Sequence, residues 1–336
     1  MTTQIATWFV RDDEADATFF PQIGLSSSAS AAHQIYWRCT AVFFASSLAK
    51  NPHYKHCFYT NCDLPTIDGV DFAKLFDGWD IEVVHLPVRH RLPAGKVESW
   101  GNQFYVFDVL DHFASSRLEE RLILLDSDCL WLRSADEMSL SIDRHGALTL
   151  PLGHDEHAQS EPINGLTREG MARFLCSHGG PVLNRIEYCG GEILAVNRDT
   201  AGRICTHAQR LWPQIIDGAP DAPREEAHLL SVIYALEGLA MGSADSFIRR
   251  MWTTFRHNNL KASDADLSIW HLPAEKRTGF AELFALICAR PHLDPRFDAD
   301  AIGLDFPAYC KAMGWPNRGP KKLARDLALK FKEKAA

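Results

Sequence analysis

The sequence predicts an α/β protein with a mainly parallel sheet flanked by helices, and three observations lead to this prediction. Short apolar runs rich in β-branched and aromatic residues alternate with longer segments of helical period, as in βα units. The chain has 336 residues, 46% of them hydrophobic, which is enough to bury a large core without disulfides or structural metal. No internal repeat or long linker interrupts this alternation.

The elements follow in order along the chain. Short, mostly apolar runs predict strands at Ile5–Val10, His56–Asn61, Ile81–Leu86, Arg121–Asp126, Ala147–Leu150, Glu192–Asn197 and Leu267–Leu272. Longer segments of helical period predict helices at Ala31–Ala49, Glu98–Phe113, Arg168–His178, Thr200–Ile216 and Arg224–Glu237. Because the chain from about Gly279 is mostly helical and punctuated by prolines, we expect one domain over residues 1–279 and a helical extension over 280–336.

Composition excludes several classes of protein. A net charge of −8 argues against a general nucleic-acid binder, which needs a cationic surface. Nine scattered cysteines without a C-x-x-C pair indicate reduced thiols, and the N-terminus lacks the pattern of a signal peptide. The longest apolar run, Cys39–Ala49, is too short to span a bilayer. We therefore expect a cytoplasmic protein whose membrane contact, if any, is peripheral.

Two carboxylates, Asp126 and Asp128, directly follow the apolar run Arg121–Leu125. The chain has neither a G-x-x-x-x-G-K-[ST] motif nor a G-x-G-x-x-G after a strand, so a nucleotide phosphate must be held in another way. Ligands of open α/β sheets bind beyond the carboxyl ends of the strands, and residues i and i+2 of extended backbone face the same side. The pair is expected to bind one divalent cation that a nucleotide diphosphate can approach. The alternative is a turn capped by Asp.

His271 ends another predicted strand, and Lys276 and Arg277 follow five and six residues later. An imidazole added to two carboxylates shifts the preference from Mg²⁺ toward Mn²⁺, and a nearby cation can neutralise a leaving diphosphate. Because the chain has 15 histidines, the alternative is an ordinary packed side chain. Two further Asp-x-Asp tripeptides, Asp264–Asp266 and Asp298–Asp300, follow no apolar strand and are interpreted as solvated turns.

The order of these features resembles that of the GT-A fold glycosyltransferases, especially the retaining group of glycogenin and bacterial lipopolysaccharide galactosyltransferases. The likeness covers roughly Ile5 to Gly279 and is strongest in ESWGNQFYVFDVLDHF and RLILLDSDCLWLRSADEM, a helix followed by a strand ending in D-x-D. The resemblance implies a Rossmann-like GT-A domain in which Asp126 and Asp128 bind Mn²⁺ and contact a nucleotide-sugar. It gives His271 the role of third metal ligand, from the family's H-x-x-G-x-x-K-P-W signature.

Three further segments take roles from the same resemblance. YCGGEILAVNRD is similar to the turn and strand that line the donor sugar, which places Gly190 and Gly191 near that sugar; the alternative is an ordinary strand entry. REEAHLLSVIYAL is similar to an acidic-start helix, so Glu226 is expected to bind sugar hydroxyls, although the helix dipole also favours an acidic residue there. WFVRDDEAD follows the first strand, so Asp12 or Asp13 is expected to accept from the base or ribose; an acidic surface loop is the alternative.

The chain departs from the family's pattern at two places. In the metal signature Ala274 replaces glycine, Arg277 replaces lysine and Pro-Trp is absent, which leaves open whether Lys276 or Arg277 contacts the diphosphate. Gln103 stands where many members have Lys or Arg, so no donor-orienting cation is assigned there.

The segment Arg318–Ala336 is strongly basic. Seven Lys or Arg residues against two acidic ones give it a net charge of +5, which leaves −13 for the rest of the chain. Leu323, Leu327 and Phe331 recur every four residues on one helical stripe, the pattern of an interfacial helix attracted to anionic lipid. The alternative is a terminal helix docked on its own domain by these three residues.

Together these features predict a metal-dependent glycosyltransferase that moves a hexose from a nucleoside diphosphate sugar, expected to be UDP-linked, to an acceptor hydroxyl. The resemblance alone implies retention of anomeric configuration and an acceptor such as a bacterial surface glycan or lipopolysaccharide. One alternative is a sugar-1-phosphate nucleotidyltransferase, which should have a Gly-rich loop after the first strand, where this chain is acidic and Ser-rich. The other is a non-catalytic, membrane-recruited adaptor, against which the intact Asp126, Asp128 and His271 argue.

Overall fold

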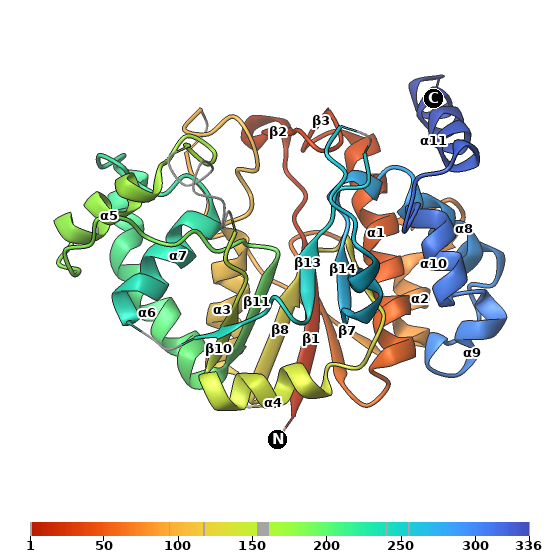
Figure 1. Cartoon of the computed structure of the whole chain (residues 1–336), viewed down its shortest axis with the longest axis horizontal. Helices are drawn as coiled ribbons and strands as arrows, with labels where there is room; N and C mark the ends of the chain where they lie inside the picture. The colour runs from red at the N-terminus through yellow and green to blue at the C-terminus, as the bar shows by residue number, and fades with distance from the viewer. Residues whose placement is uncertain are drawn as a thin grey trace.

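The computed structural model describes residues 2–93, 95–116, 118–152, 161–238, 241–254 and 256–335, with side chains in the last helix described to residue 328 (Figure 1). Within these residues, seven strands form the central sheet: β1 (Thr3–Phe9), β4 (Lys55–Thr60), β7 (Ile81–His85), β8 (Arg121–Leu125), β10 (Ala147–Thr149), β11 (Ile193–Asn197) and β12 (Gly242–Ser243). Their order is β12-β10-β11-β8-β1-β4-β7, and β11 runs antiparallel to both of its neighbours while the other described pairs are parallel. The predicted α/β class with a mainly parallel sheet is confirmed.

A second, smaller sheet lies against the first and contains the predicted strand near His271. It is formed by β9 (Cys129–Trp131), β13 (Ile248–Arg250) and β14 (Ile269–His271), in the order β13-β14-β9. Two short ribbons pair β2 (Phe19–Phe20) with β3 (Leu25–Ser26) and β5 (Thr66–Ile67) with β6 (Val70–Asp71). Because β9 follows β8 after a three-residue turn, the end of the central sheet leads directly into the smaller one.

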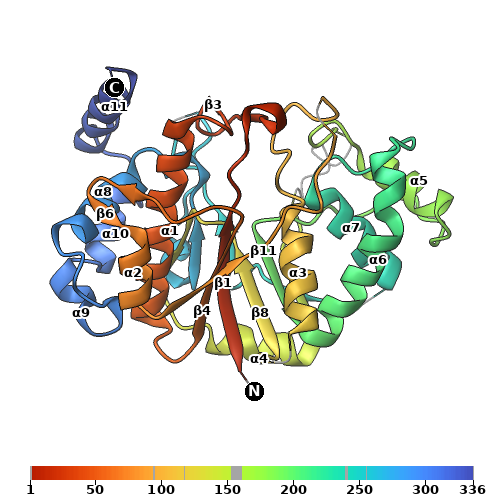
Figure 2. The same cartoon turned by 180° about the vertical axis from the view of Figure 1, so that it is seen from behind.

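Helices cover both faces of the central sheet (Figures 1 and 2). One group consists of α1 (Ser30–Lys50), α2 (Phe72–Gly78), α8 (Gly279–Ala289), α9 (Pro295–Ile302) and α10 (Phe306–Met313), and the other of α3 (Tyr105–Ser115), α5 (Arg168–Ser177), α6 (Arg198–Ile216) and α7 (Glu226–Glu237). α4 (Asp136–His145) crosses one end of the sheet. Strand alternation explains the two cores: Ile123 and Leu125 of β8 face the α1 side, and Leu122 and Leu124 the α3 side. A strand buried on both faces has the continuous apolar run seen in the sequence.

The helix predicted over Glu98–Phe113 is wrong at its start, because α3 begins at Tyr105. Trp100 adopts a left-handed backbone conformation with φ 53°, which ends any regular helix there. Asn102 donates from Nδ2 to Asp12, and the N–H of Gly101 donates to the Thr18 hydroxyl. Tertiary contacts with the loop after β1 therefore decide the conformation of this segment.

Ion pairs dock the last helix, α11 (Pro320–Ala335), through Lys322 on Glu275, just before α8, and through Arg325 on Glu282 of α8. Lys322 is buried, and its Nζ lies 2.8 Å from Glu275 Oε2 and 2.6 Å from Asp326 Oδ1. Leu323 is half-buried and Leu327 is 48% exposed, while the third residue of the predicted stripe, Phe331, lies outside the described side chains. Among the described side chains the docking therefore depends on buried charges, and docking by the whole apolar stripe stays a prediction. Among the described residues, no helix combines the length and apolarity needed to cross a membrane.

Candidate metal centre

The turn between β8 and β9 carries the two carboxylates that follow the buried strand. The N–H of Asp126 donates to the carbonyl of Glu192, and the N–H of Cys129 donates back to the carbonyl of Asp126, which closes the turn. The side chain of Asp128 is 1% exposed and that of Asp126 is 32% exposed. The structure therefore places one carboxylate inside the protein and the other at its rim, both beyond the carboxyl end of β8.

His271 joins these carboxylates through strand pairing. β14 runs antiparallel to β9 with His271 opposite Cys129, and the N–H of Leu272 donates to the carbonyl of Asp128. Nε2 of His271 lies 3.2 Å from Asp128 Oδ2 and 3.7 Å from Asp126 Oδ2. One ligand atom from each of the three residues lies within 4.8 Å of the other two. Strand pairing thus brings His271 next to Asp126 and Asp128, although it lies more than 140 positions further along the chain.

The donor set fits a divalent cation. Two carboxylate oxygens and an imidazole nitrogen are ligands suited to Mn²⁺, and less well to Mg²⁺, which prefers oxygen ligands in a near-ideal octahedron. Neither ring nitrogen of His271 has a well-aligned hydrogen-bond partner among the described residues, although both are buried. A buried polar atom without a partner is costly, and a cation at Nε2 would provide one.

Lys276 is the cation that reaches this cluster. Its Nζ donates to Asp128 Oδ2 at 2.7 Å and to Gln22 Oε1 at 2.7 Å, and it lies 5.6 Å from the centre of the Tyr36 ring. Arg277 instead donates to the backbone carbonyl of Ile23. Of the two alternatives that the sequence left open, the structure brings Lys276 to the carboxylates.

Burial and charge separate the acid strengths of the two aspartates. Burial and the neighbouring Asp128 carboxylate raise the pKa of Asp126 above its usual value. Burial also acts to raise the pKa of Asp128, but Lys276 and His271 outweigh it and lower that pKa. Burial by itself lowers the pKa of His271, whereas the carboxylates of Asp128 and Glu192 raise it to about 9. Asp128 therefore stays ionised to a lower pH than Asp126.

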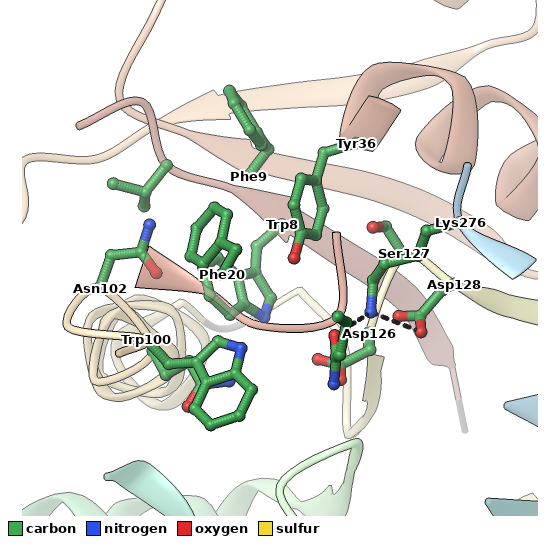
Figure 3. Close-up of a pocket in the computed structure, with 13 residues that line it drawn as sticks. Trp8, Phe9, Phe20, Tyr36, Trp100, Asn102, Asp126, Ser127, Asp128 and Lys276 are labelled. Carbon is green, nitrogen blue, oxygen red and sulfur yellow. Dashed lines mark hydrogen bonds and ion pairs between the residues drawn. The ribbon is translucent and has the colours of Figure 1, made fainter. Parts of the chain in front are cut away.

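A narrow cavity opens beside the cluster (Figure 3). Its other walls are largely aromatic and include three amides: Trp8, Phe9, Val10, Phe20, Gln22, Tyr36, Trp100, Asn102, Gln103 and Ser127. Figure 3 shows the rings gathered beside Asp126, Asp128 and Lys276. The arrangement combines flat apolar surfaces with a charged end, which suits a ligand with a ring at one end and an anionic group at the other.

Asp12 and Asp13 lie apart from this cavity. Asp12 is buried, and its two carboxylate oxygens accept from Arg91 at 2.7 Å and from Asn102 at 3.1 Å. Asp13 is exposed. Asp12 thus ties the loop after β1 to Asn102, which itself lines the cavity, and a contact of either aspartate with a nucleoside stays a prediction.

Gly190 and Gly191 leave room for two buried carboxyl groups. An added Cβ at Gly190 would lie 2.0 Å from Glu192 Oε2, and one at Gly191 would lie 2.0 Å from Glu226 Oε1. Glu226 begins α7, and burial together with the Glu225 charge raises its pKa well above the usual value. Its Oε2 has no hydrogen-bond partner among the described residues. Neither glycine is among the residues that line the cavity.

The structure corrects the interpretation of Asp264 and shows two site residues that the sequence did not indicate. Asp264, interpreted as part of a solvated turn, is buried and bonded to Arg249, so that interpretation is wrong for this residue. Glu192 and Arg250 were not singled out from the sequence, although they lie next to His271. A charged residue directly after a glycine pair at the start of a buried strand is the one local signal that pointed to Glu192.

The fold and the site define a mixed α/β protein with a candidate divalent-metal centre beyond the carboxyl end of β8, in the middle of its central sheet. No protein-family model matches the chain, and no curated protein matches its sequence. Among solved structures, the chain is similar to that of an active-site mutant of LgtC, a glycosyltransferase, with a TM-score of 0.45 and 11% sequence identity. The match covers 80% of this chain and 86% of that one. At these values the function rests on the chain's own residues.

Proposed function

We propose that this protein is a metal-dependent glycosyltransferase of the GT-A type that transfers a hexose from a nucleoside diphosphate sugar, UDP-linked, to an acceptor hydroxyl with retention of configuration. Asp126, Asp128 and His271 would hold Mn²⁺ or Mg²⁺. When bound there, the cation supplies positive charge for the diphosphate oxygens as they leave the anomeric carbon. Lys276 offsets further charge on the same side.

One observation carries this proposal: three groups suited to a divalent cation converge beyond the carboxyl end of a core strand, next to an aromatic cavity. A metal held by only three side chains keeps coordination positions open for a substrate. Lys276, whose Nζ lies 2.7 Å from Asp128, adds a second positive charge next to the open coordination positions. Charge of this kind matches a diphosphate better than a neutral ligand.

The cavity supports a ring-bearing donor such as a nucleoside. Aromatic side chains can stack on any nucleobase, and the amides of Asn102 and Gln103 offer hydrogen bonds that can orient the base. The cavity encloses only about 60 Å³. The proposal therefore requires side chains such as those of Trp100 and Gln22 to move apart when the donor binds.

Glu226, Gly190 and Gly191 complete the proposed donor site. Because the raised pKa of Glu226 favours its protonated form, this carboxyl group can donate as well as accept a hydrogen bond with sugar hydroxyls. We propose it as a sugar-orienting group and not as a nucleophile. We propose that Gly190 and Gly191 lie beside the sugar, with the carboxyl groups of Glu192 and Glu226 in the space that side chains at these positions would take.

The test is a panel of UDP- and GDP-sugars with purified protein, with and without Mn²⁺. We expect one donor to raise the unfolding temperature only when Mn²⁺ is present, and slow metal-dependent hydrolysis of that donor. Asp128→Asn should abolish both. Release of pyrophosphate from a nucleoside triphosphate and a sugar 1-phosphate would instead identify a nucleotidyltransferase. Wild-type protein that neither binds nor hydrolyses any donor would disprove the proposal.

We also propose that α11 contacts anionic membrane, which would bring the enzyme to a lipid-linked acceptor. The exposed Leu327 and the excess of basic residues in this helix support it. Truncation is a poor test, because it would also remove Lys322 from the buried Glu275. Substitution of Lys330, Lys332 and Lys334 by Gln should instead reduce sedimentation with vesicles of phosphatidylserine and phosphatidylcholine. Equal sedimentation of the two proteins would contradict the membrane contact.

A further inference from the structure

His271 lies between two buried carboxylates, one at each ring nitrogen. Asp128 Oδ2 is 3.2 Å from Nε2, on the side of the candidate metal ligands. On the opposite side of the ring, Glu192 Oε1 is 3.4 Å from Nδ1. The side chain of Glu192 has no exposed surface, and Glu192 does not belong to the group of residues that converge on the cation position.

Arg250 holds Glu192 in this position. Its Nε donates to Glu192 Oε1 at 2.8 Å and its Nη2 donates to Oε2 at 2.6 Å, so the pair is bidentate. Arg250 lies on β13, opposite His271 in the parallel pairing with β14. Burial acts to raise the pKa of Glu192, but the Arg250 charge outweighs it and lowers that pKa. Gly190 leaves the space that Oε2 occupies, since an added Cβ would lie 2.0 Å from it.

We propose that Glu192 and Arg250 form a positioning pair that fixes His271 for cation binding through Nε2, an inference that rests on the proposed metal-dependent function. A neutral imidazole carries one N–H, and on cation binding the Glu192 carboxylate, 3.4 Å from Nδ1 and not aligned with it in this structure, would accept that hydrogen. The lone pair of Nε2 then points toward Asp126 and Asp128. Arg250 keeps the carboxylate oriented and balances its charge, so Glu192 fixes the ring without itself reaching the cation.

Mn²⁺ affinity of the full chain, measured by electron paramagnetic resonance without a donor sugar, tests this role. We expect Glu192→Ala to weaken Mn²⁺ binding about 10- to 100-fold, as loss of outer partners of metal-bound histidines does. Glu192→Gln retains an acceptor oxygen for Nδ1–H and should recover most of the affinity. The matched control is Glu187→Ala, a change at an exposed glutamate five residues earlier, which should leave the affinity unchanged.

A double-mutant cycle separates positioning from other effects of the charge. In a His271→Ala background, Glu192→Ala should weaken Mn²⁺ binding no further, because the ring that it positions is gone. If Glu192→Ala weakens binding equally in both backgrounds, Glu192 acts as a ligand or a general negative charge and the proposal is overturned.

Loss of Glu192 alone leaves Arg250 buried and unpaired, so a second variant protects the test from misfolding. The double variant Glu192→Met with Arg250→Met removes both charges and should fold with reduced Mn²⁺ affinity; wild-type affinity in this variant overturns the proposal. Wild-type protein that binds Mn²⁺ alongside unaffected variants would refute the positioning pair alone. Wild-type protein that binds no Mn²⁺ would refute both this pair and the proposed function.

Discussion

Replacing Lys276 by Met should make the metal-free protein less stable and more responsive to metal. At an Nζ–Oδ2 distance of 2.7 Å, the attraction between Lys276 and Asp128 is about 6 kcal/mol with an effective dielectric constant of about 20. The desolvation of the buried ammonium offsets part of this attraction. Removing one partner of a buried pair costs about 3 to 5 kcal/mol when the other charge is left uncompensated, and the cost here is smaller because His271 remains 3.2 Å from Asp128.

Metal should reverse this loss. The Lys276 ammonium and a divalent cation are both attracted to Asp128, so removing the ammonium strengthens cation binding at the same carboxylate. Urea unfolding of the wild-type protein and of Lys276→Met, each with a chelator and with Mn²⁺, measures both effects. We expect the variant to unfold at lower urea with the chelator and to gain more than the wild type from Mn²⁺.

Arg277→Met is the matched control, because it removes one positive charge at the next position, from a guanidinium that donates to the backbone carbonyl of Ile23. It should lose less stability, and its gain from Mn²⁺ should equal that of the wild type. The reasoning is refuted if Lys276→Met loses less than about 1 kcal/mol in the chelator, or if Mn²⁺ stabilises it less than the wild type.

Three further changes test other parts of the structure. Burial lowers the pKa of His56 to about 4, below the unfolded value of about 6.5. The neutral imidazole therefore contributes about 3 kcal/mol to the unfolding free energy above pH 6.5, and this contribution is lost as the pH falls toward 4. Urea unfolding at pH 6.5 and pH 4 should show a smaller loss of unfolding free energy for His56→Asn than for the wild type. Lys322→Met leaves a buried carboxylate unpaired and should lower the unfolding free energy by about 3 to 5 kcal/mol, and an unchanged urea midpoint would contradict the docking of α11. Gly191→Ala forces its Cβ against Glu226 and should destabilise the protein by about 1 to 3 kcal/mol and slow donor hydrolysis. Gly202→Ala, inside α6 with nothing within 4 Å of the added Cβ, should instead stabilise the protein by about 0.5 to 1 kcal/mol and leave donor hydrolysis unchanged.

Local pattern was sufficient for the parts of the fold that depend on neighbours in the chain. Asp126 and Asp128 could be placed together because they follow a buried strand at positions i and i+2, and the structure brings them to one point. The end of Glu98–Phe113 was predicted and its start was not, because the contact between Asn102 and Asp12 spans 90 residues. The short helices α2 and α4 were not expected, since each offers only a few apolar positions.

Contacts between residues far apart in the chain were harder to predict from the sequence. His271 was a candidate from its place at the end of a predicted strand, and the resemblance gave it the role of third ligand; its approach to Asp128 itself follows from the pairing of β14 with β9. Arg250 gave no signal, since its partner Glu192 lies 58 residues away and buried charge pairs have no sequence period. Lys322 was counted only among the seven basic residues of the C-terminal segment, yet its side chain is buried against a carboxylate 47 residues earlier.

The docking of α11 connects the C-terminal helix to the candidate metal centre through two adjacent residues. Glu275, which binds Lys322, precedes Lys276, which binds Asp128. A ligand that shifted the backbone at Lys276 would also shift Glu275, to which Lys322 of α11 is paired. Coupling free energies are reciprocal, so a surface that binds α11 and shifts this segment would change the affinity for a ligand at Asp128 by the same factor in return.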